Sequence, residues 1–250
     1  MRLWVRFLPL IAMPLLRAQL TINPVQDYIN KTTLLNNILS NMRVTHGPVS
    51  RSPASAPAPA VVAPPSEFRP SGAMILPKRL GNEQVFAPLI AMYEETARKD
   101  RFPSNDVAYG LTYFVVNSYM TYRDLHQVEY SKDPWAKRGK DGFDRIALMG
   151  EKKTMTPTPY QERAVFLQFR ESLAKNPGIA KMTDAQKQEM TELLAITLGL
   201  NLRQYLEAVN REDDQAMAAA RGQAAANLEK LFGFPAERLK INESGFSSGQ

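Results

Sequence analysis

The histidines are the first residues to consider for chemistry, because the 250-residue chain holds only two and has no cysteine. Without cysteine there can be no disulfide framework, thiolate zinc site, iron–sulfur cluster or cysteine nucleophile. Neither His46 nor His126 has a histidine or carboxylate at the spacing of a zinc motif such as H-E-x-x-H. At the end of a predicted helix, His126 suits the negative end of the helix dipole. We therefore predict no metal site, no cofactor and no catalytic residue.

A second pattern with possible chemistry is GFSSG at residues 245–249, which fits the nucleophile motif G-x-S-x-G. That motif works as a strained turn between a strand and a following helix. Here the sequence ends one residue later. We interpret the match as a coincidence in a Ser/Gly-rich segment.

Paired carboxylates are the third candidate. Glu189 and Glu192 are three residues apart, so they share one face of a helix. A solvated helix face explains them at least as well as acid–base chemistry, which would require carboxylates to meet across a cleft. The alternative that stays open is a hydrolase of an envelope polymer of the peptidoglycan type.

The tyrosines of residues 109–130 are the most distinctive feature. Tyr109 and Tyr113 lie four residues apart beside Leu and Val, which favours packing in a core. The functional alternatives are a surface that stacks sugar rings or peptide, and an apolar cavity for a small ligand. The candidate interaction surface is Tyr109, Tyr113, Tyr119, Tyr122, His126, Trp135, Lys137 and Arg138.

The N-terminal residues 1–18 have the pattern of a secretory signal. Arg2 and Arg6 precede the apolar run FLPLIAMPLL, and Ala18 offers a small residue for cleavage. The apolar run is too short for a membrane-spanning helix. Cleavage removes three arginines and lowers the net charge from +6 to +3, so charge no longer favours a nucleic-acid partner. We expect an exported protein, periplasmic or secreted, with no transmembrane segment after cleavage.

Two segments separate this signal from the folded part. Residues 19–46 are polar, and Leu34, Leu35, Ile38 and Leu39 allow one short amphipathic helix in a flexible arm. Residues 47–72 are rich in Pro, Ala and Ser and lack the large apolar residues that would offset the entropy cost of folding. We interpret them as a disordered linker.

The rest of the chain predicts an all-α fold, a single bundle over residues 73–241 followed by a flexible tail at 242–250. Expected caps are Asn82, Ser104 and a Thr183/Gln186 capping box, with Gly233 ending the last helix. Residues 131–158 form a long, charged connection with a short helix at 143–148. The helix near 106–125 is apolar on all sides and should be the buried one. The five main helices are expected at 83–99, 106–125, 160–175, 184–210 and 213–232.

Two stretches, NDVAYGLTYFVVNSYMTYRD at 105–124 and ARGQAAANLEKLFGFPAERLKINESGF at 220–246, carry a resemblance. Residues 80–246 resemble an uncharacterised family of exported bacterial proteins with a C-terminal helical domain of unknown function. The resemblance implies export and a helical domain, and it brings no activity, cofactor or catalytic residue.

These features favour a non-catalytic interaction or structural module of the bacterial cell envelope. Its partner would be a protein or another envelope component, with no nucleic acid. Contact would be made through the 131–158 connection or the amphipathic segment of the arm.

Overall fold

The computed structural model describes residues 64–126 and 152–249, and within them the all-α prediction is confirmed. The leader, the arm, most of the linker and the expected 143–148 helix lie outside the described residues. No described helix is long and apolar enough to cross a membrane. The helices are α4 (Leu76–Arg79), α5 (Glu83–Asp100), α6 (Val107–Tyr122), α9 (Pro159–Ala174), α10 (Pro177–Lys181), α11 (Asp184–Arg211) and α12 (Asp214–Phe232).

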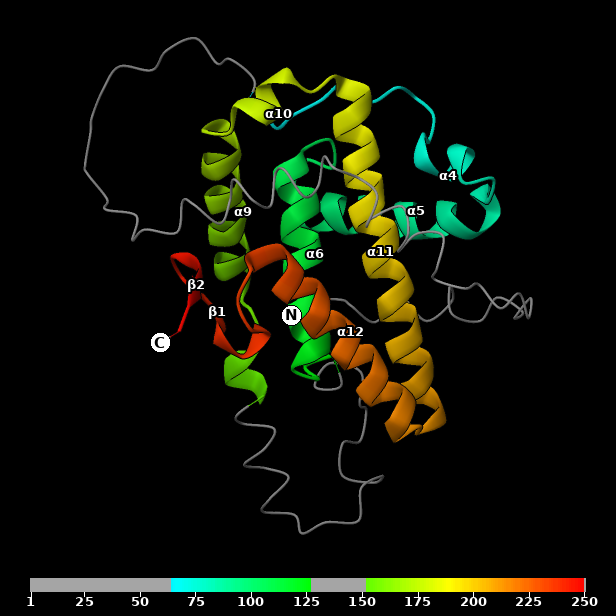
Figure 1. The fold of residues 1–250 in the computed structure, drawn as a ribbon, viewed down its shortest axis with the longest axis vertical. Helices are drawn as coiled ribbons and strands as arrows, with labels where there is room; N and C mark the ends of the chain where they lie inside the picture. The colour runs from blue at the N-terminus through cyan, green and yellow to red at the C-terminus, as the bar shows by residue number, and fades with distance from the viewer. Residues whose placement is uncertain (1–63, 127–151, 250) are drawn as a thin grey trace.

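Helix α6 is the centre of the bundle. It packs against α9, α11 and α12, which are arranged around it (Figure 1). Every residue from Val107 to Thr121 is buried, as expected for a helix that is apolar on all sides. Helix α5 packs on α11, where the absent side chain of Gly199 lets Leu89 approach closely.

Local capping fixes where most of these helices begin and end. The capping box of Thr183 and Gln186 is present at the start of α11, and Gly233 ends α12 in the left-handed conformation, both as predicted. Asn82 makes no side-chain cap on α5. The cap of α6 is Asp106, whose side chain accepts from the backbone N–H of Ala108, so Ser104 is not the cap.

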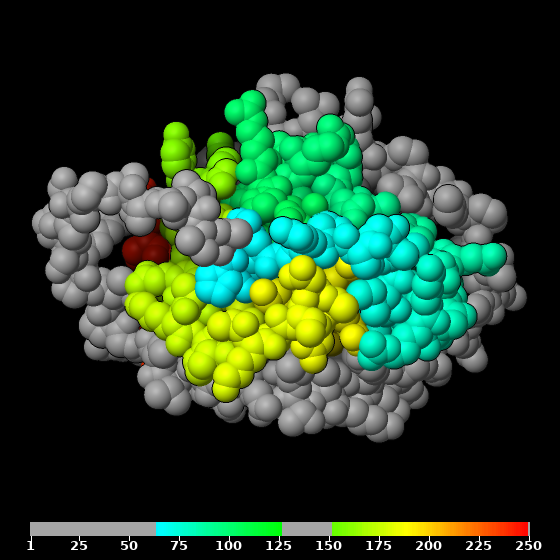
Figure 2. Space-filling model, turned by 90° about the horizontal axis from the view of Figure 1, so that it is seen from above, coloured from blue at the N-terminus to red at the C-terminus, as the bar shows by residue number. Residues whose placement is uncertain are grey.

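The segment before α4 differs from the disordered linker expected up to residue 72. Residues 64–75, here called the strap, lie across the bundle as a band between the green and yellow surfaces of Figure 2. Phe68 and Ser66 are buried, and Glu67 pairs with Asp106 in an antiparallel bridge. A single aromatic residue and backbone hydrogen bonds order the end of a Pro-rich segment whose average composition predicts disorder.

The chain end also differs from the flexible tail expected at 242–250. Strands β1 (Leu239–Asn242) and β2 (Gly245–Ser248) form an antiparallel hairpin beside α9 (Figure 1). Phe246 is buried against Phe169 and Phe232, and both of its backbone polar groups bond to the Gln168 side chain. Burial of one aromatic side chain again orders a segment whose polar composition predicts disorder.

Candidate functional site

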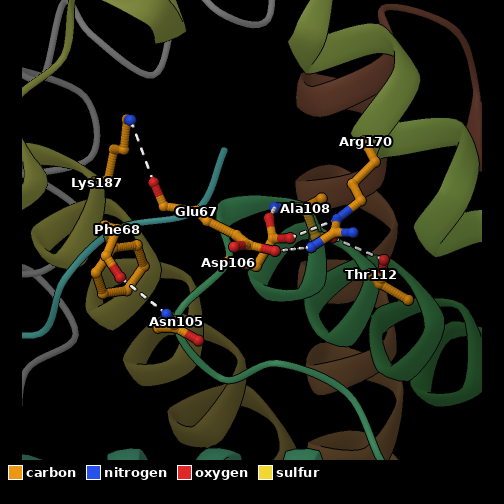
Figure 3. Close-up of polar contacts among 8 residues, drawn as sticks. All are labelled: Glu67, Phe68, Asn105, Asp106, Ala108, Thr112, Arg170 and Lys187. Carbon is orange, nitrogen blue, oxygen red and sulfur yellow. Dashed lines mark hydrogen bonds and ion pairs between the residues drawn. The ribbon is translucent and has the colours of Figure 1, made fainter. Parts of the chain in front are cut away.

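The N-terminal end of α6 is an ion-paired joint between three segments. Arg170 of α9 donates through Nε to Asp106 at 2.7 Å and through Nη2 to Glu67 of the strap (Figure 3). Asp106 is fully buried, and its other oxygen accepts from the Ala108 N–H at 2.8 Å. The guanidinium also lies 4.9 Å from the centre of the Phe166 ring. Both carboxylates are therefore committed to holding α6, α9 and the strap together.

Backbone bonds continue this joint along the strap. The Phe68 N–H donates to the Asn105 carbonyl at 3.1 Å, and the Asn105 amide returns a bond to the Phe68 carbonyl at 2.8 Å. Lys187 of α11 donates to the Glu67 carbonyl at 3.3 Å (Figure 3). These bonds depend on backbone shape more than on strap side chains.

Glu192 secures the far end of the strap. Its carboxylate is buried and accepts from the backbone N–H groups of Ile75 and Leu76, while Gln188 bonds to Ser71 and Ala73. The prediction of a solvated Glu189/Glu192 face is therefore wrong for Glu192. Glu189 is ion-paired with Arg79. Burial, followed by the charge of Glu192, raises the pKa of Glu189.

The C-terminal end of α6 carries a second polar cluster. Asp124, which has a left-handed backbone (φ 57°), accepts from the Tyr205 hydroxyl and from Lys152 Nζ, the latter at 2.5 Å. Lys152 also donates to the Asp124 carbonyl at 3.1 Å. The two residues are 28 positions apart, so their ion pair joins the end of one described range to the start of the next. Asp124 was not singled out by the sequence, and Lys152 counted only as one of the basic residues of the charged 131–158 connection.

His126 lies beside this ion pair and is almost completely buried. Its Nε2 is 3.2 Å from the Thr121 hydroxyl, which donates its own proton to the Asn117 carbonyl at 2.9 Å. The hydroxyl oxygen must therefore accept from Nε2–H, which leaves Nδ1 as a buried acceptor without a partner in the described chain. Burial lowers the pKa of His126 to about 4, so the ring is neutral at pH 7 and does not act as a charge at the helix dipole.

The exposed side of the same helix end carries arginines. The Arg123 guanidinium lies 5.1 Å from the Tyr122 ring centre and donates to the Glu237 carbonyl at 3.1 Å. Arg221 of α12 donates through Nε to the Tyr122 carbonyl at 3.0 Å. The Tyr122 hydroxyl donates to the Glu237 carboxylate at 3.1 Å. Burial, followed by this hydrogen bond, raises the pKa of Tyr122.

The structure separates the predicted interaction residues. Tyr109, Tyr113 and Tyr119 are buried, as core packing predicts, and so do not contribute to an exposed surface. Tyr122 is half-buried at the arginine cluster, and His126 lies inside the bundle. Trp135, Lys137 and Arg138 lie outside the described residues. Across the described ranges there is no group of three or more His, Asp or Glu side chains placed to hold a metal ion.

Sequence reasoning missed the residues that bond at the two ends of α6. Asp106 was the first residue of the expected 106–125 helix but not its expected cap, and Arg170, Lys152 and Tyr205 had no motif around them. Their partners are 64 to 103 positions away or, for Lys152, 28 positions away. No local spacing rule covers such distances, so the sequence offered no signal for these pairs.

Comparison with known proteins adds one similarity. Residues 152–248 match a family of unknown function (DUF6683), a stretch that runs from Lys152 through α9, α11 and α12 to the hairpin. It includes Arg170, Tyr205 and Arg221, whereas their partners Asp106, Asp124 and Tyr122 precede it. Searches of curated proteins and of solved structures gave no match. The C-terminal half of the helical domain is thus similar to a protein family of unknown function.

Proposed function

We propose that this protein is an exported bacterial protein of the cell envelope, and that its helical domain is a non-catalytic module that contacts another envelope component. The observation that carries this proposal is the strap. A Pro-rich segment leads directly into a strap that is fixed to α6, α9 and α11. Such a joint would pass tension on the N-terminal segment to the whole bundle, as a tethered module requires.

The use of the carboxylates supports an interaction role over a catalytic one. Asp106 caps α6 and pairs with Arg170, Asp124 pairs with Lys152 and Tyr205, and Glu192 accepts backbone N–H groups. A general acid or base needs a proton that it can exchange with a substrate. Each of these carboxylates is instead committed to bonds that hold helices together.

The contact region of this proposal is the C-terminal end of α6 and the connection that begins there. Asp124, which precedes this connection, is ion-paired with Lys152, which belongs to it. The connection contains Trp135, Lys137 and Arg138, three residues of types suited to binding a partner. Tyr122 and Arg123 directly precede Asp124 in the sequence, and the Arg123 guanidinium lies beside the Tyr122 ring.

Export is tested by expressing the full chain with a C-terminal tag in a bacterium, fractionating the cells and measuring the intact mass of the product. We expect a product that begins at Gln19 in the periplasmic or medium fraction. An uncleaved product in the cytosol would overturn the proposal of export. An uncleaved product in the membrane fraction would make residues 1–18 an anchor.

The contact region is tested in the same cells with a photo-crosslinking amino acid placed at one position at a time. Positions 122 and 135 should each give crosslinked products with envelope material. Position 78 is the control, because Lys78 is exposed on α4, whose Arg79 pairs with Glu189 near the start of α11, whereas Tyr205 in the C-terminal half of α11 contacts Asp124. Equal crosslinking at 78, or none at 122 and 135, would contradict the assignment.

A further inference from the structure

The arginine cluster at the C-terminal end of α6 holds positive charge that its own contacts do not neutralise. Arg123 and Arg221 donate to backbone carbonyls, Arg123 also bonds to the Tyr119 hydroxyl, and neither arginine is ion-paired with a carboxylate in the described part of the chain. Glu237 supplies a nearby carboxylate, but this group accepts from the Tyr122 hydroxyl. By contrast, Arg79, Arg98 and Arg170 are each paired with a carboxylate.

Both guanidinium groups lie close to the same residue. The Arg123 guanidinium is 5.1 Å from the Tyr122 ring centre, and Arg221 Nε is 3.0 Å from the Tyr122 carbonyl oxygen. The charges of both arginines also act to lower the pKa of the Tyr122 hydroxyl, although its burial and its bond to Glu237 outweigh them. Both arginines therefore lie beside Tyr122, Arg123 at its ring and Arg221 at its backbone carbonyl.

Donor groups at this surface are in excess. A guanidinium has five N–H donors and no acceptor. Arg123 Nε is buried and has no hydrogen-bond partner among the described residues. Arg221 is exposed, so its remaining donors can reach a ligand.

We infer that Arg123 and Arg221 together bind a phosphate-type oxyanion carried by the partner of this protein. A phosphate group presents several oxygens in different directions, so two guanidinium groups can bond to it at once. A carboxylate presents two oxygens in one plane, which a single guanidinium already matches. This inference deepens the proposed function, on which it rests for the identity of the partner as an envelope component.

The test uses the purified mature chain and inorganic phosphate as the probe, followed by calorimetry at low salt. We expect a dissociation constant of about 1 mM for so small a ligand. The Arg123→Gln/Arg221→Gln double variant should bind at least about tenfold more weakly, and Arg221→Lys should fall between the two because it keeps the charge without the planar fork. Added NaCl should weaken binding by screening exposed charges.

The control variant is Arg98→Gln, which removes the same charge from an exposed arginine that Glu95 already neutralises. It should bind phosphate as the original chain does. If the double variant does not fold by circular dichroism, the single Arg221→Gln variant carries the test, since Arg221 lies on the surface. No phosphate binding by the folded original chain, equal binding by the arginine variants, or equal loss in Arg98→Gln would overturn the inference.

Two further arms identify the source of the phosphate. One measures sedimentation with phosphatidylglycerol vesicles, and the other measures binding of soluble glycerol phosphate. Arginine-dependent sedimentation with vesicles indicates a lipid headgroup, whereas binding of glycerol phosphate without sedimentation indicates a soluble ester. Either result supports the oxyanion site. Because these assays use purified protein, their failure withdraws the partner chemistry and leaves the export result standing.

Discussion

At the N-terminal end of α6, Arg170 bonds to the carboxylates of both Asp106 and Glu67. At its C-terminal end, Arg123 and Arg221 instead donate to backbone carbonyls, and Arg123 also lies beside a tyrosine ring. Both ends gather residues that are distant in the sequence. The first end uses its charges on bonds inside the fold. The second keeps guanidinium donors unused, which suits a surface that binds an anion.

Helix polarity explains part of this difference. The N-terminal end of a helix carries partial positive charge and favours a carboxylate, while the C-terminal end favours cations. Asp106 and Arg221 each satisfy that preference through a bond to the helix backbone. What the dipole does not explain is that a carboxylate is ion-paired at each end, Asp106 with Arg170 and Asp124 with Lys152, while Arg123 and Arg221 have no carboxylate partner among the described residues. We expect the two ends to respond differently to substitution.

The largest effect should come from Asp106→Ala. This variant removes the cap of α6 and leaves Arg170 with only Glu67, so we expect a loss of about 4 kcal/mol in the free energy of unfolding. Asp106→Asn keeps an effective cap and should cost roughly half as much. Urea unfolding followed by circular dichroism measures both variants. A loss below about 1 kcal/mol for Asp106→Ala would show that this end is not a structural joint.

The next effect is a pH dependence at the buried side of the C-terminal end. The pKa of His126 is about 4 in the folded chain and near 6.5 when unfolded. Between these values the unfolded chain binds the extra proton, so stability falls as pH drops from about 6.5 to about 4, by up to about 3 kcal/mol. His126→Gln should remove this part of the pH dependence. An identical dependence of unfolding free energy on pH in both proteins would contradict the prediction.

A smaller effect is expected from Tyr205→Phe. It removes the hydroxyl that donates to Asp124 while Lys152 keeps its ion pair, so the cost should be about 1–2 kcal/mol. Tyr160→Phe serves as the control, because Tyr160 is strongly exposed and should show no change. Equal unfolding midpoints for Tyr205→Phe and the original chain would indicate that the Asp124 cluster does not need this bond.

The smallest effect on stability should come from Arg221→Gln, within about 0.5 kcal/mol, because the residue is exposed and its bond is to a carbonyl. Arg170→Gln replaces an arginine that bonds to a buried carboxylate and should cost about 3 kcal/mol. Thermal or urea unfolding of the two variants compares the loss in free energy of unfolding when an arginine is removed from each helix end. Equal costs would remove the distinction between joint and binding surface.

The helices themselves were largely predictable from the sequence. The periodicity of residues 184–210 and the Thr183/Gln186 capping box place α11 within one residue of its bounds, and Gly233 marks the end of α12. Helix α6 was expected to be buried because it is apolar on every side. These are local properties, set by side-chain spacing of three or four residues and by capping hydrogen bonds.

The strap and the hairpin were not predictable in the same way. Both lie in segments whose average composition is typical of disorder, and both are ordered by one buried aromatic residue, Phe68 or Phe246. Whether such a residue finds a pocket depends on distant elements, here α6 for the strap and α9 for the hairpin. Composition averages over a window and cannot report a contact with another part of the chain.

By itself the sequence determined the helical fold class and most helix bounds, because both depend on neighbours along the chain, and it favoured but did not decide the burial of α6. Only the tertiary structure decided which charges are paired. Asp106 meets Arg170 across 64 positions, Tyr205 meets Asp124 across 81, and Arg221 reaches the Tyr122 carbonyl across 99. The physical reason is that an ion pair or hydrogen bond requires separations of a few ångströms in space, which the folded path of the chain alone creates.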